Sequence, residues 1–222
     1  MSNIGGSWAT RAGTRAGSTA VTLTRMARGE GGTRTGVPAR RQQILEVSGD
    51  LFARRGYQSV SIYDIGAALG LSGAALYRHF PNKDAILVEL IVSHSERLLA
   101  LGRDIVASTS GNPLEPLVAA YVVNALANQA SIKVYLRDFQ SLPDEDREKA
   151  RRVQRAYVDL WVDAFCDRWP AVPRRRARSA VLAAFGLMNS TPYSADFSLP
   201  VSRAKELLHG LAMAAFEAAA AS

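Results

Sequence analysis

One run of residues, SIYDIGAALGLSGAALYRHF at positions 61–80, constrains the fold of this chain more than any other segment. Apolar residues recur at helical spacing on both sides of Gly70, with Ile62, Ile65 and Leu69 before it and Leu76 and Phe80 after it. Ser61 and Ser72 each stand where a helix N-terminal cap is expected. Two short helices joined by a tight turn form a helix-turn-helix, whose second helix enters the DNA major groove.

The flanking segments, RRQQILEVSGDLFARRGYQSVS upstream and PNKDAIL downstream, extend this pattern. Residues 40–87 together resemble the DNA-binding domain of the TetR family of bacterial transcription repressors. The likeness rests on residue types at fixed offsets, namely Ile44, Leu51, Phe52, Gly56, Ser61, Asp64, Ile65, Gly70, Leu71, Ser72, Leu76, Tyr77, Arg78, His79, Phe80 and Lys83. The resemblance implies an all-α fold of about nine helices, with an N-terminal three-helix DNA-binding head and a C-terminal helical ligand-binding and dimerisation domain.

Composition agrees with a nucleic-acid partner but does not require one. The net charge is +7 and the isoelectric point is near 9.9, which favours a polyanionic partner, although an unrelated basic protein would show the same values. The single cysteine, Cys166, forbids an intramolecular disulfide and provides no metal cluster. No apolar run reaches the roughly 18 residues that span a bilayer, and the N-terminus lacks a signal core, so we expect a cytoplasmic protein.

The chain divides into three predicted parts. Residues 1–38 form a disordered basic tail with five arginines against one glutamate, which either contacts DNA or is a spacer or a mis-assigned start. Residues 39–85 form the TetR-type helix-turn-helix domain, and residues 86–222 form the ligand-binding and dimerisation domain. Further helices are predicted at 39–55, where Gly56 supplies a left-handed stop, and at 82–106, 117–130, 132–140, 144–169, 177–190 and 201–219.

The candidate DNA-binding residues are Arg40, Ser61, Ser72, Gly73, Ala74, Ala75, Tyr77, Arg78, His79 and Lys83. The resemblance implies that Tyr77, His79 and Lys83 grip the phosphate backbone, with a structural hydrogen bond as the alternative for His79. Ser61 can offer its hydroxyl and N–H groups to a phosphate. The start of the recognition helix carries only small side chains, which cannot make the bidentate contacts that distinguish purines. Specificity therefore depends on DNA shape, the tail and dimer spacing, while Gly66 adds flexibility to the preceding helix.

A ligand pocket is expected in the C-terminal domain, where aromatic residues concentrate. The candidate pocket residues are Tyr121, Asn124, Tyr135, Phe139, Tyr157, Trp161 and Phe165. Ordinary core packing is the alternative for Tyr157, Trp161 and Phe165, and a neighbouring backbone group is the alternative partner for Asn124. His94 is expected to be a core histidine rather than a ligand contact. The effector is predicted to be hydrophobic or amphipathic, either an acyl-CoA or a drug-like compound.

The last two helices are rich in small residues, and the resemblance implies that they pair with a second subunit as a four-helix bundle; intramolecular packing is the alternative. We find no phosphate loop, dinucleotide fingerprint, zinc spacing or nucleophile elbow, so no enzyme, cofactor or metal is predicted. The sequence therefore predicts a homodimeric, ligand-responsive repressor that binds a near-palindromic double-stranded DNA operator. Two alternatives stay open: a sequence-indifferent architectural DNA-binding protein, and an enzyme that uses the C-terminal domain.

Overall fold

The computed structural model describes residues 37–190 and 199–221 of the chain. The predicted basic tail at 1–38 lies outside the described residues except for Val37 and Pro38, which begin the first described helix. Most of the loop between the last two helices also lies outside them.

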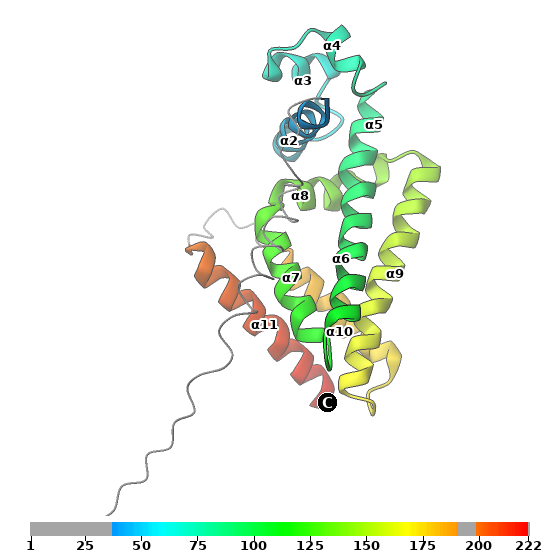
Figure 1. The fold of residues 1–222 in the computed structure, drawn as a ribbon, viewed down its shortest axis with the longest axis vertical. Helices are drawn as coiled ribbons and strands as arrows, with labels where there is room; N and C mark the ends of the chain where they lie inside the picture. Colours follow the sequence, from blue (N-terminus) through cyan, green and yellow to red (C-terminus); the bar gives the residue numbers. More distant parts are fainter. Residues whose placement is uncertain (1–36, 191–198, 222) are drawn as a thin grey trace, which may run out of the picture. The chain divides into compact units, whose positions relative to one another are not determined.

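The described residues are helical almost throughout, and Figure 1 shows their arrangement. In chain order the elements are α2 (Val37–Arg55), α3 (Ile62–Leu69), α4 (Gly73–Tyr77), α5 (Lys83–Val88), the π-helix η1 (Glu89–Ser93), α6 (His94–Ser108), α7 (Leu114–Ala127), α8 (Gln129–Asp138), the 3-10 turn η2 (Phe139–Ser141), α9 (Asp144–Arg168), α10 (Arg174–Met188) and α11 (Val201–Ala221). The predicted all-α fold is confirmed for this part of the chain.

The elements α5, η1 and α6 form one continuous rod that starts in the head and runs alongside α9 (Figure 1). The sequence predicted a single helix at 82–106, and the rod occupies Lys83–Ser108 with a π-helical turn at Glu89–Ser93 inside it. Within the described residues, counting this rod once leaves nine helices, as predicted. A π turn inside an α-helix is rare and often marks a functional position.

The head, α2 to α4, forms because its caps and stops are local. The Ser61 hydroxyl accepts from the Asp64 N–H at 3.1 Å and opens α3, while Gly70, with φ of +65°, ends it. Gly56 ends α2 at φ of +91°, which confirms the predicted stop. The apolar stripes then meet in one core, where Ile44, Phe52, Ile65, Leu76 and Phe80 are fully buried.

The remaining helices, α6 to α11, surround a second core whose largest buried side chain is Trp161. The helix predicted at 117–130 occupies Leu114–Ala127, and the one predicted at 177–190 occupies Arg174–Met188. Both helices begin earlier than the apolar pattern indicated, α7 directly after Pro113 and α10 directly after Pro173. No helix in the described ranges is long and apolar enough to cross a membrane.

Candidate nucleic-acid interface and effector site

The turn between α3 and α4 requires a close approach of two backbone segments. The Leu71 N–H donates to the Gly66 carbonyl at 2.8 Å, and a Cβ atom on Gly66 would lie 2.9 Å from the Leu71 carbonyl oxygen. Gly66 is buried, so there is no open space for this atom. We therefore correct the interpretation of Gly66 as a source of flexibility: the missing side chain permits the tight turn.

The turn presents the start of α4 to solvent. The Ser72 hydroxyl accepts from the Ala75 N–H at 3.3 Å, so this side chain caps the recognition helix. Ser72, Ala74, Tyr77 and Arg78 are exposed, while Gly73 and Ala75 are half-buried. The predicted reading face of α4 is therefore accessible. Its exposed long side chains, Tyr77 and Arg78, lie at the C-terminal end of the helix.

Ser61 differs from its expected role, because both of its donors are engaged within the head. Its backbone N–H donates to Asp64 Oδ2 at 2.7 Å, and its hydroxyl donates to the same oxygen. These two hydrogen bonds from Ser61 hold the pKa of the Asp64 carboxyl below its usual value, so the carboxylate stays charged. A phosphate contact by Ser61 requires Asp64 to release it.

Lys83 likewise points into the head. Its Nζ donates to the carbonyl oxygens of Tyr57 and Val60, each at 2.9 Å, and lies 4.2 Å from the centre of the Tyr57 ring. The Tyr57 hydroxyl in turn donates to Asp84, next to Lys83. Two of the three ammonium donors of Lys83 are thus used to fix the chain after α2, and only the third is available to a phosphate.

The other predicted DNA contacts, at Tyr77, Arg40 and His79, differ in their exposure and in their hydrogen-bond partners. Tyr77 is 48% exposed, and Arg40, half-buried, donates to its neighbour Gln43 at 2.6 Å. His79 is half-buried, with Nδ1 buried and without a partner, and its carbonyl oxygen accepts from Arg41. Arg41 pairs with Glu89 of η1, and its guanidinium carbon lies 3.9 Å from the centre of the Phe80 ring.

The sequence analysis missed Tyr63, the most exposed large hydrophobic side chain of the head at 73%. Its ring lies against α4, 3.5 Å from where a Cβ of Gly73 would be. Because Tyr63 falls off the apolar stripe of α3, periodicity gave no reason to select it. The signal that could have found it is its type, since an aromatic residue at a solvent position of a short helix is unusual.

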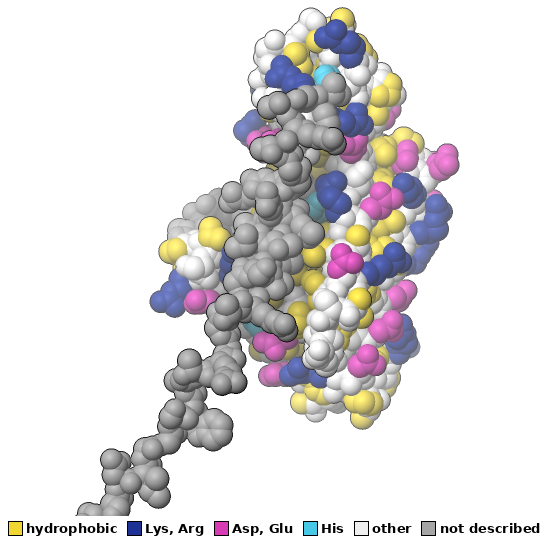
Figure 2. All heavy atoms as spheres, viewed as in Figure 1, with side chains coloured by type: hydrophobic (Ala, Val, Ile, Leu, Met, Phe, Trp, Pro, Cys, Tyr) yellow, Lys and Arg dark blue, Asp and Glu magenta, His cyan; other side chains and the backbone are white. Residues whose placement is uncertain are grey.

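The charge pattern differs between the head and the body. Figure 2 shows Lys and Arg side chains over the head, whereas Lys and Arg alternate with Asp and Glu over α9. In the body, Arg174 donates to Asp163 at 2.5 Å and Arg178 donates to Asp159 at 2.7 Å, so acidic partners neutralise these two charges.

The predicted aromatic pocket residues separate into three places. Tyr121, Tyr157 and Trp161 come together with Phe185 of α10, and the ring centres of the Tyr121, Trp161 and Phe185 trio are 4.8 to 5.8 Å apart. We call these four residues the aromatic cluster. Phe165 packs instead against Trp169 and Phe216, while Tyr135 and Phe139 contact each other beside the head core.

Among the residues that the structure describes, the hydrogen-bond partners around the aromatic cluster are neutral. The Tyr121 hydroxyl lies 3.1 Å from Asn189 Oδ1, and the Tyr135 hydroxyl accepts from Gln154. Burial raises the pKa of Tyr121 and of Tyr135 to about 12 and raises the pKa of Tyr157 further. These phenols remain protonated donors at physiological pH.

One buried donor beside the cluster, Asn124 Nδ2, has no partner among the described residues. Asn124 uses its oxygen to accept from Asn128 at 2.9 Å, which leaves its N–H groups to be satisfied. A buried unpaired donor costs roughly 1 to 3 kcal/mol, so a ligand acceptor here would be stabilising. The sequence analysis missed Asn189, Gln154 and Phe185, because tertiary packing alone brings them here. No group of three or more His, Cys, Asp or Glu that could hold a metal occurs among the described residues.

Two family models match this chain. The model described as bacterial regulatory proteins, tetR family, matches residues 44–90, and the model described as tetracyclin repressor-like, C-terminal domain, matches residues 107–193. Together they cover more than half of the chain, including the helix-turn-helix and the aromatic cluster. The chain belongs to the TetR family.

TetR-family relatives of known name and structure agree with this membership. The chain is 33% identical over 137 residues to the HTH-type transcriptional repressor KstR2 of Mycobacterium tuberculosis, an alignment that spans 57% of this chain and 65% of that repressor. A TetR-family transcriptional regulator from Bordetella parapertussis is 27% identical, with a TM-score of 0.70 over 78% of this chain and 93% of that one. The structure of the ketosteroid transcriptional regulator KstR2 of Mycobacterium tuberculosis shares the fold, with a TM-score of 0.72 and 20% identity over 85% of this chain and 96% of that one.

Proposed function

We propose that this TetR-family chain is a homodimeric transcription repressor, which binds a near-palindromic operator and is released by a small effector. The observation that carries the proposal is the exposed start of α4 on a head whose core is fully buried. Such a helix can enter the major groove without unfolding anything. Family membership supports the same reading, since its matched models cover both the head and the body.

Different residues contact the phosphates, which position the head on DNA, and the base edges, which determine sequence preference. Tyr63, Tyr77 and Arg78 present exposed donors around α4 and contact phosphates. Ala74 contacts thymine methyl groups, and Ser72 donates to a base edge. Because the reading face is small, DNA shape and the spacing of two heads contribute much of the specificity.

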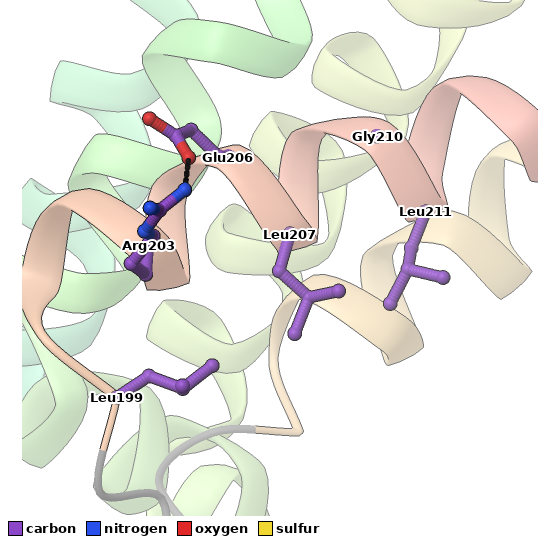
Figure 3. Close-up of a pocket in the computed structure, with 6 residues that line it drawn as sticks. All are labelled: Leu199, Arg203, Glu206, Leu207, Gly210 and Leu211. Atoms are coloured by element: carbon purple, nitrogen blue, oxygen red, sulfur yellow. Dashed lines mark hydrogen bonds and ion pairs between the residues drawn. The ribbon is translucent and has the colours of Figure 1, made fainter.

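The second subunit docks on the apolar face of α10 and α11. Leu182, Leu207 and Leu211 are 43% to 52% exposed on these two helices. Figure 3 shows Leu207 and Leu211 pointing to the same side of α11, beside a groove of about 620 Å³ that Arg203 and Glu206 border. An exposed apolar face with a charged border is typical of a subunit interface.

The effector binds at the aromatic cluster and opens it. The neutral surroundings and the unpaired amide of Asn124 favour a ligand whose buried part is apolar and uncharged and carries a hydrogen-bond acceptor. A polycyclic ketone fits this description, as does the acyl part of an acyl-CoA; the name of the related ketosteroid regulator favours the first. An effector that prefers the released conformation by about 3 kcal/mol lowers operator affinity roughly a hundredfold.

The alternative function is an architectural DNA-binding protein without sequence preference. The small side chains at the start of α4 favour it, since they provide no bidentate base contact. The two functions differ in selectivity rather than in fold.

Selection from fragmented genomic DNA separates them. Wild-type protein is incubated with fragments at physiological salt, and the bound DNA is sequenced. A repressor enriches a few sites with two half-sites related by dyad symmetry and spaced by a multiple of about 10 base pairs. Enrichment that follows only base composition would contradict the proposal, and an Arg78→Ala variant should lose the enriched sites.

A further inference from the structure

The helix α8 is attached to the head on one side and to the body on the other. Two residues apart on a helix, Tyr135 and Arg137 point in nearly opposite directions, since each residue turns the helix by about 100°. The Tyr135 hydroxyl accepts a hydrogen bond from Gln154 of α9, and Tyr121 of the aromatic cluster contributes to its raised pKa. Gln154 lies three residues before Tyr157 on α9, so Tyr135 links α8 to the part of α9 that carries Tyr157 and Trp161 of the cluster.

Arg137 makes the opposite attachment, to the last turn of α2. Its guanidinium donates to the carbonyl oxygens of Phe52 and of Ala53, the latter at 3.3 Å, across more than 80 residues of sequence. The guanidinium carbon lies 4.0 Å from where a Cβ of Gly56 would be. The last carbonyls of a helix lack intrahelical partners and carry its negative dipole end, so a cation there is favourable.

The neighbouring Asp138 fixes the direction of this guanidinium. Its carboxylate accepts from Arg137 at 2.8 Å, and the side chain is buried, with 7% of its surface exposed. A buried carboxylate needs its partner, so Arg137 is held in place rather than free to reorient. The result is a helix C-terminal cap supplied by a different helix.

The cap matters because the head has few other attachments to the body. One is the α5–η1–α6 rod, to which Arg41 of α2 is joined by an ion pair with Glu89. Gln58, between α2 and α3, also donates to the Ser141 hydroxyl at 3.3 Å, and α8 packs along α2 and carries the Arg137 cap. A displacement of α8 at Tyr135 is therefore transmitted to the C-terminal end of α2, and from there to the angle of α3 and α4.

We propose that Arg137 is a positioning residue that couples the state of the aromatic cluster to the orientation of the DNA-binding head. The proposal rests on the proposed repressor function, because its readout is operator affinity. In this role Arg137 contacts neither DNA nor effector and acts by holding the C-terminal end of α2.

A double-mutant cycle tests the coupling without any knowledge of the effector. Operator dissociation constants are measured by fluorescence anisotropy for the wild type, Tyr135→Phe, Arg137→Lys and the double variant, with dimer mass and melting temperature recorded for each. Tyr135→Phe removes the α8–α9 hydrogen bond, and Arg137→Lys keeps the charge beside Asp138 but loses the fork that reaches two carbonyls. If coupling runs through Arg137, Tyr135→Phe changes operator affinity at least threefold in the wild type and leaves it unchanged in the Arg137→Lys background.

Arg147 supplies the matched control, because its guanidinium also donates to two carbonyl oxygens, those of Leu142 and Gln140, but within the body. In an Arg147→Lys background the effect of Tyr135→Phe should persist in full. Additive effects of Tyr135→Phe and Arg137→Lys, or no effect of Tyr135→Phe in the wild type, would overturn the coupling. A second variant, Arg137→Met with Asp138→Asn, removes both charges together and must give the same result. Failure of the wild type to bind any operator would instead overturn the proposed function.

Discussion

The ammonium group of Lys83 lies between two carbonyl oxygens, those of Tyr57 and Val60, at 2.9 Å from each. The sequence predicted a phosphate contact for this residue, and the structure gives it a role in holding the α2–α3 connection. Both roles fit a lysine with three donors, but they predict different effects of its removal.

We expect Lys83→Met to lower the free energy of unfolding by about 2 kcal/mol, since hydrogen bonds from a charged donor contribute roughly that much. Urea unfolding followed by circular dichroism measures the change. Lys149→Met is the control: its ammonium pairs with Glu96 at 2.9 Å with both side chains largely exposed, and such pairs contribute less than about 1 kcal/mol. Equal stabilities of wild type and Lys83→Met would show that the lysine serves DNA alone.

Gly66→Ala should destabilise the head, because the added Cβ would lie 2.9 Å from the backbone oxygen of Leu71. Backbone cannot move aside cheaply, so we expect a loss of about 1 to 3 kcal/mol. Gly49→Ala in α2 is the matched variant, where the nearest atom is Leu90 Cδ2 at 3.6 Å, an ordinary contact. That substitution should be neutral or stabilising by up to about 1 kcal/mol, since alanine favours helix. The melting temperatures of the two variants, measured under the same conditions as the wild type, test this prediction. Equal melting temperatures for Gly66→Ala and Gly49→Ala would contradict it.

His94 predicts a specific dependence of stability on pH. Burial, with a smaller contribution from Arg97, lowers the pKa of His94 to about 4, and Nε2 has no partner. The unfolded chain, with a histidine pKa near 6.5, binds more protons between these values, so stability is complete above pH 6.5 and falls as the pH drops toward 4. The full effect is about 3 kcal/mol. His94→Leu should show a shallower fall over this window in urea unfolding, and parallel curves would contradict the assignment.

The exposed leucines of α10 and α11 predict the oligomeric state. Leu207→Glu combined with Leu211→Glu should convert a dimer to a monomer of 23.9 kDa in sedimentation velocity, because burying two carboxylates between subunits is costly. Val106 of α6 is 41% exposed but lies on a different helix, so Val106→Glu should leave the dimer intact. A wild-type chain that sediments as a monomer at micromolar concentration would contradict the proposed interface.

Local features of the head were predictable from sequence, and its long-range partners were not. The caps at Ser61 and Ser72 and the left-handed glycines depend on residues within four positions, so type and spacing suffice. The partners of Arg41 and Lys83 depend on which helices meet. The sequence shows only that these two residues are cationic and lie near the motif. Without their tertiary partners, both would be interpreted as available to a DNA phosphate.

The body shows the same division. Periodicity predicted the helix at Asp144–Arg168 within a residue, because one strongly amphipathic pattern spans it. The π turn at Glu89–Ser93 has no periodic signal in its sequence. The predicted pocket residues were all aromatic or polar residues of the body, yet only the packing of α7, α9 and α10 separates Tyr121, Tyr157 and Trp161 from Tyr135, Phe139 and Phe165.

The central claim is that α4 reads a particular operator, and a competition experiment tests it most directly. A labelled operator identified by genomic selection is bound to wild-type protein at about 150 mM salt and displaced by unlabelled operator or by random duplex of equal length. The account predicts that random DNA is needed in at least about a thousandfold excess over operator for the same displacement. Equal displacement by the two DNAs would contradict it.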